Sequence, residues 1–174
     1  NAYQAGKIIA EEARAVGIHW NLSPVVDVNN NHLNPIINTR SFGEDPGLVS
    51  EFAIALMKGL QDHGMLATAK HFPGHGDTES DSHSSLAMIP SDSARLWSVE
   101  IPPFQAMTSA GVDAIMVAHV HAPDYQPKSD IPASLTPFWI QTILRERLGF
   151  KGVVITDAMG MGGITKNYSD AFAL

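Results

Sequence analysis

The segment between residues 70 and 85, KHFPGHGDTESDSHSS, concentrates side chains that can move protons or bind polar ligands. It is almost free of core-building residues, although 44% of the whole chain is hydrophobic. Asp81 and His83 stand two residues apart, and in an extended loop this spacing lets the carboxylate orient the imidazole and raise its basicity. We therefore treat Asp81 and His83 as a candidate acid/base pair on a movable loop. The alternative is a solvated loop in which Asp-x-His occurs by chance.

Polar residues also follow apolar, strand-like runs at several other points: Asp27, Lys70 with His71, His119 with His121, and Asp157. Active sites of α/β barrels lie at the C-terminal ends of the strands, and those of open α/β sheets lie in a crevice at the same edge. In either case these side chains are predicted to converge. Asp157, which ends GVVITD, is placed to face a ligand; its alternative role is to cap the next helix or to bind a loop amide.

Two cations lie close to these strand ends. A lysine at the end of a buried strand is costly without a partner, so Lys70 pairs with a core carboxylate such as Asp27 or binds a polar ligand. Arg40, in NTRSFG, could grip a ligand oxygen or hold its own loop to Glu44 or Asp45. The Phe72–Pro73 bond leaves a strand at a sharp turn, which is a place where the uncommon cis X–Pro peptide can occur.

A metal site is an alternative use of the histidines and carboxylates in the 70–85 segment. An oxygen–nitrogen ligand set would be formed by His71, His75, Asp77, Asp81 and His83. The specific zinc pattern needs His-x3-His on a helix, however, and Pro73, Gly74 and Gly76 exclude a helix here. We expect no metal and no cofactor.

Helix and strand patterns alternate along the chain. Helices are predicted over 2–16, 46–63, 102–110 and 137–148, and strands over 18–28, 65–72, 112–120 and 151–157. The strands are nearly continuous apolar runs, which is typical of parallel strands covered by helices on both faces. This predicts an α/β fold. Four strands cannot close an eight-stranded barrel, so the sheet is open or belongs to a barrel with further strands.

Composition narrows the classes of function. The 174 residues carry a net charge of −7 without clustered Lys or Arg, which argues against nucleic acid and against an anionic membrane surface. No apolar run approaches the roughly 18 residues of a membrane span. The absence of cysteine excludes disulfides and thiolate zinc sites. The chain begins with Asn inside a predicted helix, so we expect a piece of a longer protein.

Four blocks in this order, NTRSFGEDP, KHFPGHGDTESDSH, IMVAHV and GFKGVVITDAMGM, resemble glycoside hydrolase family 3, and more narrowly its β-N-acetylglucosaminidase branch. The resemblance implies a (β/α)8 TIM-barrel-type fold. Residues 1–174 would be the central part of its N-terminal catalytic barrel domain, with about four to five β/α units present. An incomplete barrel exposes strand edges, so oligomerisation is an expected consequence. The bacterial cytoplasm and the periplasm or exterior are both compatible with the sequence.

The resemblance also assigns roles to residues. It implies that Asp157 is the nucleophile of a retaining mechanism, that His83 is the general acid/base and that Asp81 supports it. Sugar hydroxyls would be bound by three further residues, Arg40, Lys70 and His71. Two departures stand out: the D-x-E-G-G strand end of the family has no match, and Ala158 replaces a residue that is often polar.

The expected reaction is release of terminal β-linked N-acetylglucosamine from peptidoglycan or chitin oligosaccharides. Within the family, a phosphorylase is the first alternative, because a histidine does not repel incoming phosphate as a carboxylate does, and a β-glucosidase is the second. Outside it, a metal-dependent hydrolase and a non-catalytic sugar-binding fragment remain open.

Overall fold

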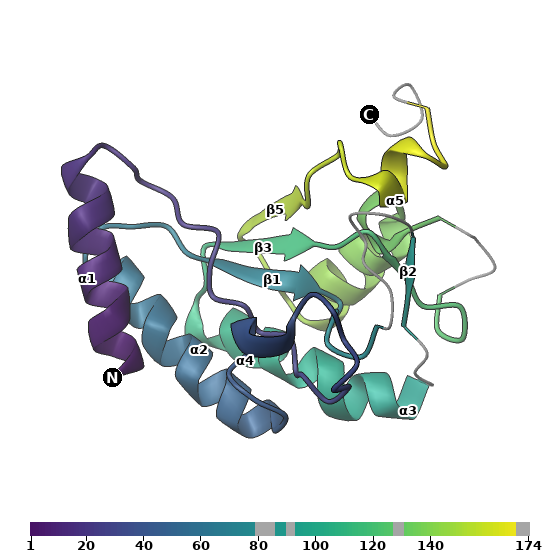
Figure 1. Ribbon diagram of the computed structural model, residues 1–174, viewed down its shortest axis with the longest axis horizontal. Coiled ribbons are helices and arrows are strands. Elements are labelled where there is room, and N and C mark those ends of the chain that lie inside the picture. Colours follow the sequence, from purple (N-terminus) through teal and green to yellow (C-terminus); the bar gives the residue numbers. More distant parts are fainter. Residues whose placement is uncertain (79–85, 90–92, 127–130, 170–174) are drawn as a thin grey trace.

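A computed structural model describes residues 1–78, 86–89, 93–126 and 131–169. Its centre is a parallel sheet of three strands in the order β1 (Thr68–Phe72), β3 (Ala114–Val117) and β5 (Val153–Thr156). A fourth segment runs beside β1 through two parallel bridges, Trp20 with Leu66 and Val25 with Lys70. The sheet therefore grows in one direction as the chain proceeds (Figure 1).

The predicted strand over 18–28 is wrong as a continuous strand, because only these two isolated bridges form. Pro24 lies between them, and proline has no backbone N–H to donate to a sheet ladder. The other three strands lie within their predicted ranges. Their parallel pairing confirms the α/β prediction.

Helices cover the sheet. The helices α1 (Ala2–Ala15), α2 (Pro46–Gln61) and α4 (Ile101–Ala110), together with η4 (Phe138–Arg147), coincide closely with the four predicted helices. Asp45 caps α2 as predicted, since its side chain accepts a hydrogen bond from the Leu48 amide at 2.7 Å. Figure 1 shows α1 beside α2, and α2 and α4 along the sheet.

The helix around α4 begins earlier than predicted. A helical run of α3 (Ser93–Arg95) and η2 (Leu96–Glu100) leads directly into α4. Pro102 and Pro103 indicated a start, yet they lie within this run. The π-helical winding of η2 immediately precedes them, and such local adjustment is how helices accommodate missing amide donors. The same winding occurs in η4.

Short elements complete the fold. They are η1 (Asn38–Arg40), β2 (Ala87–Met88), β4 (Val120–His121), η3 (Ala133–Leu135) and α5 (Gly162–Thr165). β2 and β4 pair in parallel just beyond the carboxyl end of β3. Of the described helices, none combines the length and the apolar character that crossing a membrane requires.

The core lies between the sheet and the helices. Phe72 of β1 packs edge-on against Phe104 of α4 at 5.2 Å and against Trp139 of η4 at 6.0 Å between ring centroids. Helices α1 and α2 meet through Gly6 and Gly59, where a Cβ on either residue would run into the backbone of the other helix. Glycine at both positions is therefore what permits this close approach.

An apolar hollow of about 630 Å³ opens at the N-terminal ends of the strands, lined by residues that include Trp20, Leu66, Thr108, Asp113 and Val153. Its place is opposite to the strand ends that carry the predicted site residues. In barrels, the N-terminal face contributes stability, whereas chemistry occurs at the C-terminal face. The hollow is therefore not the candidate site.

Candidate active site at the carboxyl ends of the strands

The predicted convergence of polar side chains at the carboxyl edge of the sheet is observed for Asp27, Lys70, His71 and Asp157, whereas His121 contacts Gln126. Asp27 follows the bridged segment, Lys70 and His71 lie near the end of β1, and Asp157 directly follows β5. The Lys70 ammonium is close enough to Arg40, Asp157 and Asp27 for each to influence its pKa. These side chains therefore share one electrostatic environment.

Asp27 is the centre of this group. Its carboxylate accepts hydrogen bonds from His71 Nδ1 at 2.7 Å and from the His75 backbone amide at 2.7 Å, and the His71 amide adds contacts at 3.2 Å. Burial alone would raise the pKa of the Asp27 carboxyl, but the charge and hydrogen bonds of His71, with those of His75, lower it below its usual range. Asp27 is thus held ionised.

An ionised Asp27 fixes the orientation of His71. A carboxylate only accepts hydrogen bonds, so the proton of a neutral His71 imidazole sits on Nδ1 and leaves Nε2 as an acceptor. Nε2 lies 3.4 Å from Nη2 of Arg40, which can donate to it. The sequence predicted that His71 and Arg40 belong to one site. The hydrogen bonds between Asp27 and His71 and between His71 and Arg40 explain how the two side chains are aligned.

Lys70 lies half-buried between the charges of the site. Burial lowers the pKa of the Lys70 ammonium and Arg40 lowers it further, whereas Asp157 and Asp27 oppose this shift. The suggested pairing of Lys70 with Asp27 alone is therefore incomplete, because the hydrogen bonds of Asp27 go to His71 and His75. The negative charges of Asp157 and Asp27 both favour the protonated form of Lys70.

Asp157 is held by backbone contacts. Its amide donates to the Val117 carbonyl of β3 at 2.9 Å, and its Oδ1 accepts from the Ala158 amide at 2.8 Å. The suggested helix cap is wrong, since the next helix, α5, begins five residues later at Gly162, whereas the suggested bond to a loop amide is confirmed by the contact with Ala158. Asp157 thus presents a half-buried carboxylate at the strand end.

Arg40 does not hold its loop in the manner suggested as an alternative. Asp45 caps α2, and the described contacts of Arg40 are to the Ile36 carbonyl at 3.3 Å and to His71. Its side chain thus belongs to the site and not to the start of α2.

His75 and Thr78 anchor the base of the segment that leads to residue 79. The Thr78 hydroxyl lies 2.6 Å from His75 Nδ1, and Asn34 donates to the His75 carbonyl at 2.7 Å. Burial lowers the pKa of His75, with Asp27 opposing the shift.

In the part of the chain that the structure describes, no group of three potential ligands is placed to hold a metal. Asp81 and His83 lie outside the described residues.

The Phe72–Pro73 peptide, at the turn out of β1 where a cis bond was considered possible, is cis, and the Lys70–His71 peptide is cis as well. No sequence signal pointed to the second cis bond. The first of these bonds follows His71 by one residue, and the second joins Lys70 to His71.

Glu100 is a residue that sequence reasoning missed. It is only 1% exposed, its Oε1 accepts from Asn30 Nδ2 at 3.2 Å, and it packs against Gly74, where a Cβ would lie 2.7 Å from Oε2. Burial raises the pKa of the Glu100 carboxyl to about 8; Asp27 and Asp77 add to this, while Asn30 and Arg95 oppose it. A glutamate two residues before a pair of prolines is typical of a helix start. No local sequence pattern indicates that Glu100 is buried under the 73–78 turn.

Parallel strands in chain order, helices outside them and polar residues at the carboxyl ends define part of a (β/α)8-type barrel. The sequence agrees with this class over its length: residues 1–173 match the model of the glycosyl hydrolase family 3 N-terminal domain. The chain therefore belongs to glycosyl hydrolase family 3, as its sequence blocks predicted.

Individual relatives narrow the comparison. A β-hexosaminidase of Stenotrophomonas maltophilia is 44% identical over 88% of this chain, which spans 44% of that relative. A family 3 β-N-acetylglucosaminidase structure from Paenibacillus has a TM-score of 0.94 at 46% identity, covering 96% of this chain and 32% of that one. The structure of a β-glucoside phosphorylase, BglX, bound to 2FGlc has a TM-score of 0.91 at 33% identity. The match covers 95% of this chain and 31% of that one. The chain thus spans less than half of these proteins.

Proposed function

We propose that the chain forms the central part of the catalytic barrel of a retaining exo-glycosidase that releases terminal β-linked N-acetylglucosamine. The observation that carries this proposal is the Asp157 carboxylate at the end of β5, within electrostatic reach of Lys70 in a cluster that includes Arg40 and His71. The likeness to a β-hexosaminidase and to a β-N-acetylglucosaminidase supports the choice of sugar.

In the proposed first step, an Asp157 oxygen forms a bond to the anomeric carbon while the glycosidic carbon–oxygen bond breaks. His83, supported by Asp81, donates its proton to the leaving oxygen. In the second step the same imidazole takes a proton from water, whose oxygen displaces Asp157. Histidine suits both steps because its charge changes near neutral pH.

Three further side chains of the site have a separate role in this proposal. Arg40, Lys70 and His71 bind hydroxyls of the sugar and hold it against Asp157. The alignment of His71 by Asp27 supports this role, since a fixed imidazole presents Nε2 in one direction. Peptidoglycan fragments and chitin oligosaccharides both carry the required terminal sugar.

A phosphorylase is the second candidate. The similarity to a β-glucoside phosphorylase, BglX, favours it, and so does a histidine acid/base, which carries no negative charge to repel phosphate. Measuring product formation with and without phosphate separates the two: glycosyl phosphate in place of free sugar would move the assignment to the phosphorylase.

Replacement of the nucleophile tests the main proposal. Asp157→Ala should reduce turnover of an aryl β-N-acetylglucosaminide by at least about 10⁴-fold, because the covalent path is lost. Asp62→Ala removes an exposed carboxylate that contacts Tyr3 at 3.0 Å and serves as the matched control. A mechanism-based fluorosugar should label Asp157; labelling of another carboxylate, or normal turnover of Asp157→Ala, would overturn the assignment.

A further inference from the structure

The backbone that follows Asp157 determines where its carboxylate points. The Ala158 amide donates to Asp157 Oδ1 at 2.8 Å, so a rotation of the Ala158 backbone would move the Asp157 carboxylate with it. Ala158 is exposed, and the sequence continues as Met-Gly-Met-Gly-Gly. The first buried side chain after Asp157 is that of Met161, four residues further on, so side-chain packing close to the carboxylate is limited. The position of the carboxylate therefore depends on contacts made by the backbone itself.

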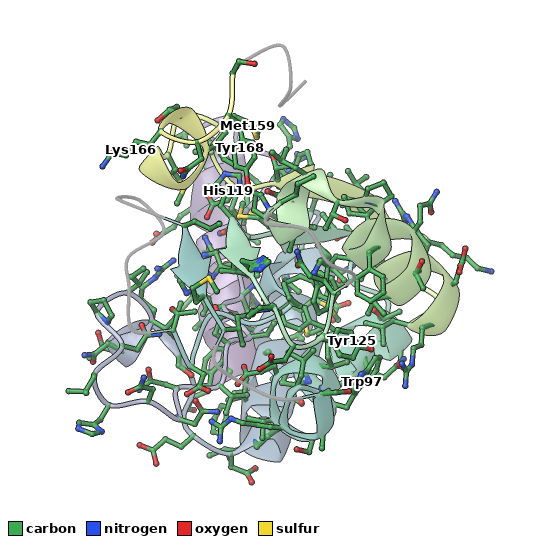
Figure 2. All side chains as sticks on the ribbon, turned by 90° about the vertical axis from the view of Figure 1, so that its right-hand side faces the viewer. Trp97, His119, Tyr125, Met159, Lys166 and Tyr168 are labelled. Carbon is green, nitrogen blue, oxygen red and sulfur yellow. The ribbon has the colours of Figure 1, made fainter. Side chains whose placement is uncertain are left out.

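One such contact comes from His119, which lies two residues beyond the end of β3 and is fully buried. Its Nε2 lies 3.1 Å from the Ala158 carbonyl oxygen, and its Nδ1 lies 2.7 Å from the Ser134 hydroxyl of η3. Figure 2 shows His119 next to the part of the chain that carries Met159 and Tyr168. A single imidazole thus connects three segments that are distant in sequence.

The two contacts define the protonation of the ring. A carbonyl oxygen only accepts, so Nε2 of His119 carries the proton; Nδ1 of the neutral ring then accepts from the Ser134 hydroxyl. The Ala158 carbonyl therefore selects the tautomer, and the Ser134 hydroxyl, which can donate or accept, donates to Nδ1 in that tautomer. Because Val117 of the same strand also accepts from the Asp157 amide at 2.9 Å, the carboxyl end of β3 holds the backbone on both sides of the Asp157 side chain.

We propose that His119 is a positioning residue that aligns the Asp157 carboxylate for attack through its hydrogen bond to the Ala158 carbonyl. This inference rests on the proposed function of Asp157. Displacements of about 1 Å in a reacting group can cost about 10²-fold in rate. Loss of the hydrogen bond should therefore lower the rate of the bond-forming step and leave substrate binding nearly unchanged.

The test compares His119→Gln with His119→Asn in the full-length protein that contains this chain. Both replacements are polar amides, but the Gln side-chain nitrogen reaches the position of Nε2, whereas that of Asn reaches only the position of Nδ1. The Gln variant should keep kcat/KM for an activated aryl glycoside at least 10-fold above that of the Asn variant, with KM differing by less than about 3-fold. The rate of fluorosugar labelling should follow the same order.

Two parallel variants make the outcome decisive. Met57→Ala, which opens a cavity in α2 away from the site, controls for lost stability and should retain kcat/KM despite a lower Tm. Asp157→Ala tests the function on which the inference depends. If Asp157→Ala is inactive and the Gln and Asn variants are equally active, or Asn is the faster, the role of His119 is refuted alone. An active Asp157→Ala variant would overturn both proposals.

Discussion

At the scale of single residues, the site is organised by the Asp27 carboxylate, which makes no sugar contact in the proposed mechanism. It accepts hydrogen bonds from the side chain and backbone of His71 and from the backbone of His75. The sequence indicated Asp27 only as one of several polar strand ends. Its role as an acceptor depends on how the turn after β1 folds back, and this is not encoded in any local spacing.

We expect Asp27→Asn to lower kcat/KM by about 10–100-fold, chiefly through a higher KM. The amide retains one acceptor oxygen but leaves a buried donor facing His71, so the imidazole loses its fixed tautomer. Steady-state kinetics on an aryl β-N-acetylglucosaminide would measure this, with Asp62→Asn as the exposed control. Unchanged kinetics in the Asp27 variant would remove it from the alignment of His71.

The four helices could be predicted because their caps, apolar faces and terminal glycines are local signals. Asp45 and Pro46 marked the start of α2, and Gly111 marked the end of α4. The early start at Ser93 could not be read in the same way, because it depends on how the preceding segment packs. The interruption at Pro24 had a local signal, a proline without an amide donor, which the strand prediction over 18–28 did not use. Among the candidate site residues, the sequence named Arg40, Lys70, His71 and Asp157 from strand ends and motif blocks, whereas the burial of Glu100 and the contacts of His119 required the fold.

The contact between α1 and α2 gives a prediction for these elements. Gly59→Ala should lower the free energy of unfolding by about 2 kcal/mol or more, because the new methyl group meets the backbone of α1 and forces the helices apart. Gly160→Ala is a suitable control, since a Cβ there meets no atom within 4 Å. Urea denaturation measures both; an equal midpoint for the two variants would show that the helices separate without cost.

For the molecule as a whole, the buried acid Glu100 couples folding to pH. Its folded-state pKa is raised to about 8 from an ordinary value of 4.5. Between these values the folded chain keeps a proton that the unfolded chain releases, so this group makes stability fall as pH rises. The fall begins above the unfolded pKa and ends as pH passes the folded pKa.

Glu100→Gln should therefore become more stable relative to the unsubstituted protein as pH is raised from about 5 to about 8.5, by at most about 1.4 kcal/mol per pH unit. Glutamine has nearly the same shape and carries no ionisable proton. Urea midpoints of both proteins at several pH values provide the measurement. A difference that stays constant across this range would show that Glu100 is already ionised in the folded protein.

The separation of the hollow from the polar strand ends has a practical consequence for engineering. Thr108 lines the hollow, and its hydroxyl is buried without a hydrogen-bond partner among the described residues. Exchange for the nearly isosteric valine would remove that unmet polar group. Because the hollow and the chemistry occupy opposite ends of the sheet, thermostability could be optimised at one end while specificity is redesigned at the other.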